Sequence, residues 1–249
     1  MFNEFHYQVR GRAHERDGTP GQDRTTYLSR AGIQAMCLAD GAGSASKSTR
    51  GAQAAADEGC VALTELFDSL VTSNDADQSR REILNRLHAR LAEVARRLDC
   101  SLSDLASTFL AVAVSEDAFV AVHIGDGVIG YLKHGELRVV SAPDNDEFAN
   151  QTTFLTSESA ADSMRLFRGS LDGVSGFLLM SDGTSASLYD YRTRELAPAC
   201  VKLIDAVCAA RTRQIKNPEH KKVLRHLIDT RVRQATRDDC SIGILGRRL

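Results

Sequence analysis

The chain alternates between short apolar runs and longer stretches in which apolar residues recur at helical spacing. Short apolar runs bounded by glycine and polar residues predict β-strands, and recurrence every three to four residues predicts helices. The predicted strands are residues 5–13, 33–39, 108–114, 118–124, 128–133, 136–140, 153–155, 177–180 and 240–245. The predicted helices are residues 49–70, 79–98, 196–214 and 218–235. Helices in pairs beside many antiparallel strands favour an α+β sandwich.

The chain of 249 residues contains no Pro/Gly/Ser-rich linker, so we expect a single domain over residues 1–249. Residues 142–175 are polar and weakly patterned, and we expect them to form an irregular flap over the functional site. The formal net charge is −2, which gives no general attraction for nucleic acid. No apolar stretch approaches the length of a membrane span, and the first residues do not resemble a secretory signal. A cytoplasmic protein without a membrane partner is expected.

Three strand-like apolar runs end in Asp-Gly, at Asp40, Asp126 and Asp182, and the acidic pair Asp238-Asp239 precedes a fourth such run. A carboxylate at the tip of a buried strand is held rigidly. Several such carboxylates together make an oxygen-rich cage of the kind that hard divalent cations prefer. The recurrence therefore predicts a metal-dependent enzyme.

Asp-Gly is also a strong hairpin-turn signal, and this alternative has a different weight at each position. Strands are predicted on both sides of Asp126, so a plain turn and a functional carboxylate both stay open there. After Asp40 and Asp182 a helix is predicted instead, which excludes a simple hairpin. The glycine after Asp40 lets the backbone approach an ion, and the Gly41 carbonyl oxygen is itself a candidate ligand.

The order of these motifs resembles that of the metal-dependent protein phosphatases, the protein phosphatase 2C-like or PPM family. The resemblance covers nearly the whole chain, and the stretch from residue 14 to residue 23 is most similar to a bacterial branch of the family. The matching segments are Gly11-Arg12-Ala13-His14, Gly21-Gln22-Asp23, Ala39-Asp40-Gly41-Ala42-Gly43, Ser107-Thr108, Ile124-Gly125-Asp126-Gly127, Met180-Ser181-Asp182-Gly183 and Asp238-Asp239-Cys240-Ser241.

The resemblance implies a four-layer α-β-β-α sandwich, with two central antiparallel sheets each flanked by helices. It also implies two Mg²⁺ or Mn²⁺ ions that activate a water for attack on phosphorus. Asp40 would bridge both ions and Gly41 would serve one of them. Asp182 and Asp238 would complete the other side, and Asp182 is, with Asp40, the expected catalytic pair. The two remaining positions are Asp23, acting directly or through a water, and Asp126, holding a third, weaker ion together with Asp182.

Three positions depart from the family pattern. His14 stands where the family has a phosphate-binding arginine, and either Arg12 or Arg16 is a candidate to assist it. We take His14 and Arg16 as the predicted phosphate-binding residues. Gln22 replaces a glutamate and removes one negative charge from the cage, whereas Asp239 replaces an asparagine and restores it.

The resulting hypothesis is a metal-dependent hydrolase of phosphoserine and phosphothreonine in proteins, monomeric and acting opposite a Ser/Thr kinase. Two alternatives stay open: a catalytically weak relative that binds or scaffolds phosphoproteins, and a phosphatase of small phosphorylated metabolites. The segment from residue 211 to residue 237 carries nine Lys and Arg against two acidic residues. A solvated helix surface explains this bias, and a docking face for phosphoproteins is the alternative.

Overall fold

The computed structural model describes residues 1–143, 152–210 and 219–248. These residues form two five-stranded sheets in which every neighbouring pair is antiparallel. The first sheet has the order β1 (Phe2–Val9), β12 (Cys240–Arg247), β9 (Val174–Met180), β6 (Val128–Lys133), β7 (Glu136–Ser141). The second has the order β2 (Arg24–Arg30), β3 (Ile33–Ala39), β4 (Phe109–Val114), β5 (Ala118–Ile124), β8 (Arg165–Ser170).

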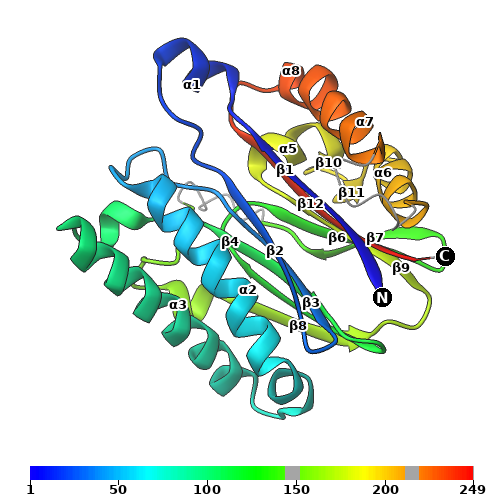
Figure 1. The fold of residues 1–249 in the computed structure, drawn as a ribbon, viewed down its shortest axis with the longest axis horizontal. Helices are drawn as coiled ribbons and strands as arrows, with labels where there is room; N and C mark the ends of the chain where they lie inside the picture. The colour runs from blue at the N-terminus through cyan, green and yellow to red at the C-terminus, as the bar shows by residue number, and fades with distance from the viewer. Residues whose placement is uncertain (144–151, 211–218, 249) are drawn as a thin grey trace.

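Helices cover the outer face of each sheet, which gives the four layers seen in Figure 1. α2 (Ser48–Thr72) and α3 (Ala76–Leu98) lie over the second sheet, with α2 in contact with β2, β3 and β4. α6 (Ala199–Cys208) and α7 (Glu219–Leu227) lie over the first sheet. The predicted α+β class and the α-β-β-α layering are therefore confirmed. The first and last strands pair with each other, which places the ends of the chain side by side (Figure 1).

The apolar runs of the central strands are continuous because both of their faces are buried. In β3, Ala35 and Cys37 pack under the α2–α3 helices, while Met36 and Leu38 pack between the two sheets. The layer between the sheets also contains aromatic side chains, and the rings of Tyr131 and Phe177 stack with centroids 6.0 Å apart. Burial on both faces stabilises a strand strongly. The continuous apolar run that such burial requires also allows the strand to be predicted from the sequence.

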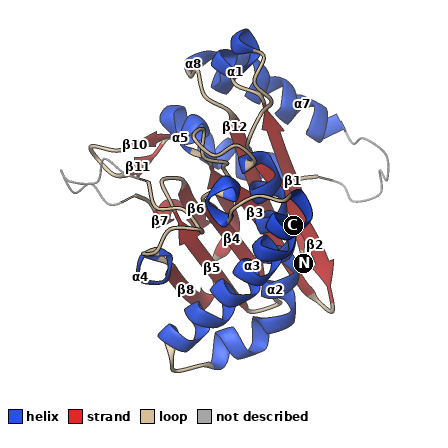
Figure 2. Cartoon of the chain, turned by 90° about the vertical axis from the view of Figure 1, so that its left-hand side faces the viewer, coloured by secondary structure: helices blue, strands red, loops and turns tan. Residues whose placement is uncertain are grey.

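Short elements complete the fold. They are α1 (Arg12–Asp17), the 3₁₀ turn η1 (Leu102–Leu105), α4 (Ala160–Ser163), α5 (Asp182–Leu188), the small hairpin of β10 (Tyr189–Asp190) and β11 (Glu195–Leu196), the π-helical turn η2 (Ile228–Val232) and α8 (Arg233–Ala235). α1 and α8 lie together at one end of the molecule (Figure 2). Within the described ranges, no helix combines the length and apolar character needed to cross a membrane.

Several predicted boundaries were wrong. The first strand spans Phe2–Val9 rather than residues 5–13, and Ala13 lies in the unpredicted helix α1. Residues 153–155 form no strand, whereas the segment expected to be irregular contains strand β8. The unpredicted strand β2 carries polar residues on an edge of the sheet. Residues 211–214 of the predicted helix 196–214 and residue 218 of the predicted helix 218–235 lie outside the described ranges. The second of these helices is divided into α7, η2 and α8.

Candidate metal centre

The acidic residues singled out by the motifs stand where strands of both sheets begin or end. Asp40 follows β3, and Asp23 precedes β2. Because Arg24 pairs with Ala39 across these two strands, both aspartates lie just beyond the same cross-strand pair. Asp126 follows β5, while Asp182 opens α5 directly after β9. The sandwich therefore collects carboxylates that are far apart in the sequence.

Two hydrogen bonds to Thr108 hold the backbone of Asp40 in place. Its N–H donates to Thr108 Oγ1 at 2.9 Å, and the Thr108 N–H donates to the Asp40 carbonyl at 2.8 Å. Gly41 forms an isolated bridge with Ser107, and its carbonyl accepts no recorded hydrogen bond from the described part of the chain. Burial raises the pKa of Asp40 well above its ordinary value, and repulsion from Asp23 and Asp182 adds to the rise. These three carboxylates are thus close neighbours.

Asp23 is 2% exposed, and neither of its carboxylate oxygens has a hydrogen-bond donor among the described residues. Burial raises its pKa from 3.8 to about 7, and the charge of Asp239 contributes to the rise, although interactions with Asp40, Ser241 and Ser181 partly offset it. A buried carboxylate without donors is costly as an anion. It becomes favourable when it is protonated or when a cation binds beside it.

Asp182 joins the remaining acids to this group. Its pKa rises from 3.8 to about 6, first through burial and then through the charges of Asp238 and Asp126. The exposed Asp238 accepts a hydrogen bond from the Asp239 N–H at 2.8 Å, and Asp126 accepts one from Thr152 Oγ1 at 2.7 Å. Asp23, Asp40, Asp126, Asp182 and Asp238 therefore form one acidic cluster.

The connection that carries Asp126 is a crossover between the sheets. β5 belongs to the second sheet and β6 to the first, so the hairpin alternative for Asp126-Gly127 was wrong. Gly125 adopts φ +110°, and a Cβ there would lie 2.5 Å from the Thr108 side chain. A glycine is required at this crossing because a larger residue would be strained and would collide with the residue that fixes Asp40.

Asp239, at the position of the family asparagine, uses both of its carboxylate oxygens to accept hydrogen bonds from backbone N–H groups of this chain. It is 1% exposed, its Oδ1 accepts from the Gly11 N–H at 2.6 Å, and its Oδ2 accepts from the Gln22 N–H at 2.5 Å. The Gln22 side chain donates to Ser48 Oγ at 2.9 Å. Asp239 therefore fastens α1 and the loop before Asp23 to the start of β12.

The two predicted phosphate-binding residues have different surroundings. His14 is half-buried on α1, with Nδ1 3.0 Å from Asp239 Oδ1. Arg16 has a side chain that is 74% exposed, and both of its recorded hydrogen bonds go to Asp17. The structure therefore connects His14 to the acidic cluster through Asp239, whereas Arg16 has no recorded contact with that cluster.

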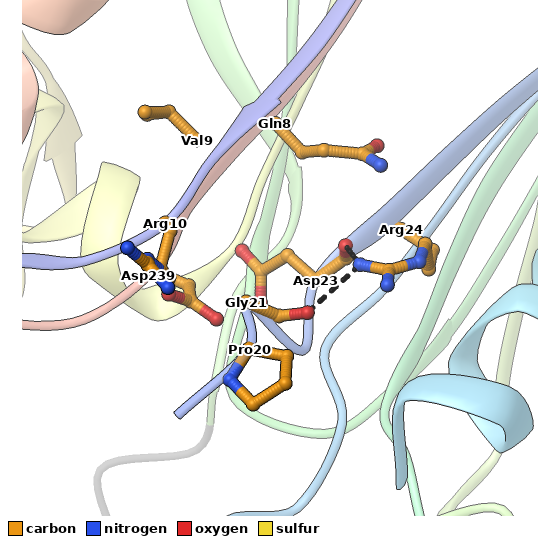
Figure 3. Close-up of a pocket in the computed structure, with 8 residues that line it drawn as sticks. All are labelled: Gln8, Val9, Arg10, Pro20, Gly21, Asp23, Arg24 and Asp239. Atoms are coloured by element: carbon orange, nitrogen blue, oxygen red, sulfur yellow. Dashed lines mark hydrogen bonds between the residues drawn. The ribbon is translucent and has the colours of Figure 1, made fainter. Parts of the chain in front are cut away.

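A pocket of about 380 Å³ opens beside Asp23 (Figure 3). Asp23 and Asp239 lie next to each other in it, and the guanidinium of Arg24 donates to the carbonyls of Gly21 and Asp23 at 3.0 and 2.5 Å. No motif singled out Arg24, because these bonds depend on how the loop turns. The residues that line the pocket are Gln8, Val9, Arg10, Pro20, Gly21, Asp23, Arg24 and Asp239.

The donor set fits a hard divalent cation. Carboxylates and a backbone carbonyl are the ligands that Mg²⁺ and Mn²⁺ take, with water in the other positions. The donor-free oxygens of Asp23 and the raised pKa values of Asp40 and Asp182 indicate uncompensated negative charge. Among the described residues, however, no three Asp, Glu, His or Cys side chains already converge as metal ligands. A bound ion would therefore need waters or small side-chain rotations to complete its shell.

Two stacked antiparallel sheets flanked by helices, with acidic residues at their strand ends, define an α-β-β-α sandwich with a candidate metal centre. The sequence profile described as Protein phosphatase 2C matches residues 10–228, and the chain belongs to this family. The resemblance found in the motifs is therefore confirmed.

Relatives of known structure or sequence agree with the family assignment. Serine/threonine-protein phosphatase 3 of Escherichia coli K12 is 31% identical over 136 residues, a match that spans 54% of this chain and 53% of that protein. The match thus covers about half the length of this curated relative. The serine/threonine phosphatase Stp1 of Staphylococcus aureus has the same fold at 15% identity, with a TM-score of 0.64 over 100% of this chain and 96% of that one. The serine/threonine phosphatase PstP/Ppp of Mycobacterium tuberculosis gives 17% identity and a TM-score of 0.59 over 100% and 99%.

Proposed function

We propose that this protein hydrolyses phosphoserine and phosphothreonine in proteins and depends on two Mg²⁺ or Mn²⁺ ions for this activity. The observation that carries the proposal is the proximity of Asp23, Asp40 and Asp182, whose side-chain carboxylates have no recorded hydrogen bond or ion pair with a Lys or Arg of the described chain. Buried negative charge at strand tips is stabilised either by protonation or by cations from outside the chain, and a bound metal ion is the second case. Family membership and the names of the relatives support the same activity.

Within this proposal, each acidic residue has a position suited to a metal ligand. Asp40 would contact both ions and the Gly41 carbonyl one of them, since the main chain holds this pair in place. Asp182 and Asp238 would bind on the other side, and Asp23 would bind directly or through a water. Asp126 would hold a third ion together with Asp182. The bound ions would neutralise phosphate oxygens and lower the pKa of a water that attacks phosphorus.

His14 is the proposed contact of this chain with the phosphate group. Its Nδ1 is held by Asp239, so Nε2 is the ring nitrogen that can donate to a phosphate oxygen. The contact with Asp239 also fixes the orientation of the imidazole ring. Arg16 can assist only from the exposed side of α1, where Asp17 already pairs with it.

A phosphopeptide assay tests the proposal. We expect release of phosphate with Mn²⁺, none with EDTA, and none from Asp40→Asn or Asp182→Asn. Asp68→Asn, an exposed aspartate on α2, is the matched control and should keep full activity. Absence of metal-dependent hydrolysis by a folded wild type that still binds phosphopeptide would favour the scaffolding alternative. Faster turnover of small metabolite phosphates than of phosphopeptides would favour the metabolite phosphatase.

We further propose that the protein acts as a monomer in the cytoplasm, opposite a Ser/Thr kinase. Sedimentation of the purified protein tests the first of these statements. A complex larger than one chain at micromolar concentration would contradict it.

A further inference from the structure

A second hollow, of about 280 Å³, lies between α1 and the segment that leads from α8 into β12. Its lining consists of Arg12, Ala13, Arg16 and Arg237. Arg12 and Arg16 are four residues apart and therefore share one face of α1. The Ala13 N–H donates to the Arg237 carbonyl at 2.9 Å, which joins the two walls. Three arginines from two separate segments thus surround one space.

Most of the positive charge in this hollow is not neutralised. Arg16 is paired with Asp17, while the nearby Glu15 is already paired with Arg233. Arg12 has one recorded side-chain hydrogen bond, from Nε to the Thr236 carbonyl at 3.0 Å. Arg237 is exposed and has no recorded side-chain partner among the described residues. About two uncompensated guanidinium charges therefore remain, and their mutual repulsion would be relieved by an anion in the hollow.

We propose that this hollow binds a second phosphate group of a substrate that is phosphorylated at two nearby residues. A phosphate monoester carries a charge of about −1.5 to −2 at neutral pH, which matches the uncompensated charge. Guanidinium groups bind phosphate through paired hydrogen bonds, and the free Nη groups of Arg12 and Arg237 can supply them.

The hollow is also well placed relative to the proposed catalytic site, on which this inference rests. His14, which would meet the scissile phosphate, lies on the same short helix as Arg12. Asp239, which holds His14, is two residues after Arg237. One substrate segment can therefore place one phosphate at the acidic cluster and another against the arginines. The outcome would be a preference for doubly phosphorylated protein segments.

The test is a binding measurement that does not depend on turnover. Fluorescence anisotropy in Mn²⁺ would compare three peptides whose phosphates are replaced by phosphonates that cannot be hydrolysed: one singly modified, one doubly modified, and one in which glutamate replaces the second modified residue. We expect the doubly modified peptide to bind about tenfold more tightly than the other two. Arg237→Gln should reduce this ratio, and the Arg12→Gln/Arg237→Gln double variant should bring it close to one. Arg81→Gln, an exposed arginine on α3, is the control and should leave the ratio unchanged.

Other results would overturn the inference. Equal affinity of wild type for the singly and doubly modified peptides would exclude a second phosphate site. If glutamate and the phosphonate at the second position increased the affinity equally, the hollow would be a general site for acidic residues and not a phosphate site. A ratio that persists in the double variant, with its melting temperature unchanged, would place the second phosphate elsewhere. If the singly modified peptide does not bind more tightly in Mn²⁺ than in EDTA, the phosphatase proposal fails instead, so the two failures are distinguishable.

Discussion

Replacing Asp23 by asparagine is expected to stabilise the metal-free protein at neutral and alkaline pH. The wild-type carboxylate is buried, and its oxygens have no hydrogen-bond donor in the described chain. Asparagine has nearly the same shape and carries no charge, and its amide can donate to Asp40. The substitution therefore removes the cost of a buried anion without opening a cavity.

The size of the effect depends on the pKa of Asp23, which rises from 3.8 to about 7 in the folded protein. One pH unit corresponds to about 1.4 kcal/mol, so the ionised carboxylate costs the folded state on the order of 4 kcal/mol. Because the folded state binds the proton more tightly than the unfolded state, stability decreases as the pH rises between about 4 and 7. The variant should match wild type near pH 4 and exceed it most above pH 7.

Urea unfolding followed by circular dichroism, with EDTA present and from pH 4 to pH 8, measures this difference directly. Asp68→Asn is the control and should show the wild-type curve. If wild type and Asp23→Asn kept the same free energy of unfolding from pH 4 to pH 8, the cost assigned to Asp23 would be refuted. In Mn²⁺ the order should change, because a bound ion stabilises the folded wild type by an amount that grows with free metal.

Three further substitutions test the surroundings of the cluster. Gln22→Glu should tighten Mn²⁺ binding in calorimetry because it adds a carboxylate, which can accept from the Ser48 hydroxyl where the wild-type amide donates to it. Unchanged affinity would show that residue 22 does not face the ions. Gly183→Ala should lower activity and stability, since the new Cβ would lie 2.1 Å from the Asp239 carbonyl oxygen. A variant with the wild-type melting temperature and the wild-type rate of hydrolysis would contradict this. Asp239→Asn should lower the free energy of unfolding in urea by about 1–3 kcal/mol, because one amide oxygen cannot accept from both the Gly11 and Gln22 N–H groups. A smaller loss would mean that one of these two hydrogen bonds contributes little to stability.

Most central strands were predicted to within two residues, although β9 begins three residues before its predicted start, and the reason for this accuracy is their burial. β3 matches its prediction of residues 33–39 because apolar side chains are needed on both faces. β2 and β8 lie at the edges of the second sheet and carry polar residues, so their patterns do not stand out. α1 has no buried residues. It is held by hydrogen bonds to a distant segment, in which the Gly11 N–H donates to Asp239 and the Ala13 N–H donates to the Arg237 carbonyl.

The Asp-Gly motifs carried different amounts of information about the site. The helices predicted after Asp40 and Asp182 excluded a hairpin, and both residues lie in the acidic cluster. For Asp126 the sequence left a turn open, because only the assignment of β5 and β6 to different sheets decides it. Asp239 was interpreted as a replacement charge for the cage, yet its oxygens bind the main chain of two other segments.

The sequence by itself determined the family, the buried strands and the acidic residues at their ends, because these are local patterns of residue type and order. The tertiary structure decided which of these carboxylates are buried, which of them accept hydrogen bonds from N–H groups, and which arginines of α1 and of the segment before β12 line one hollow. The physical reason is that the energy of a charge depends on its distance from other charges and from solvent. Those distances are set by the packing of two sheets whose strands are far apart in the chain.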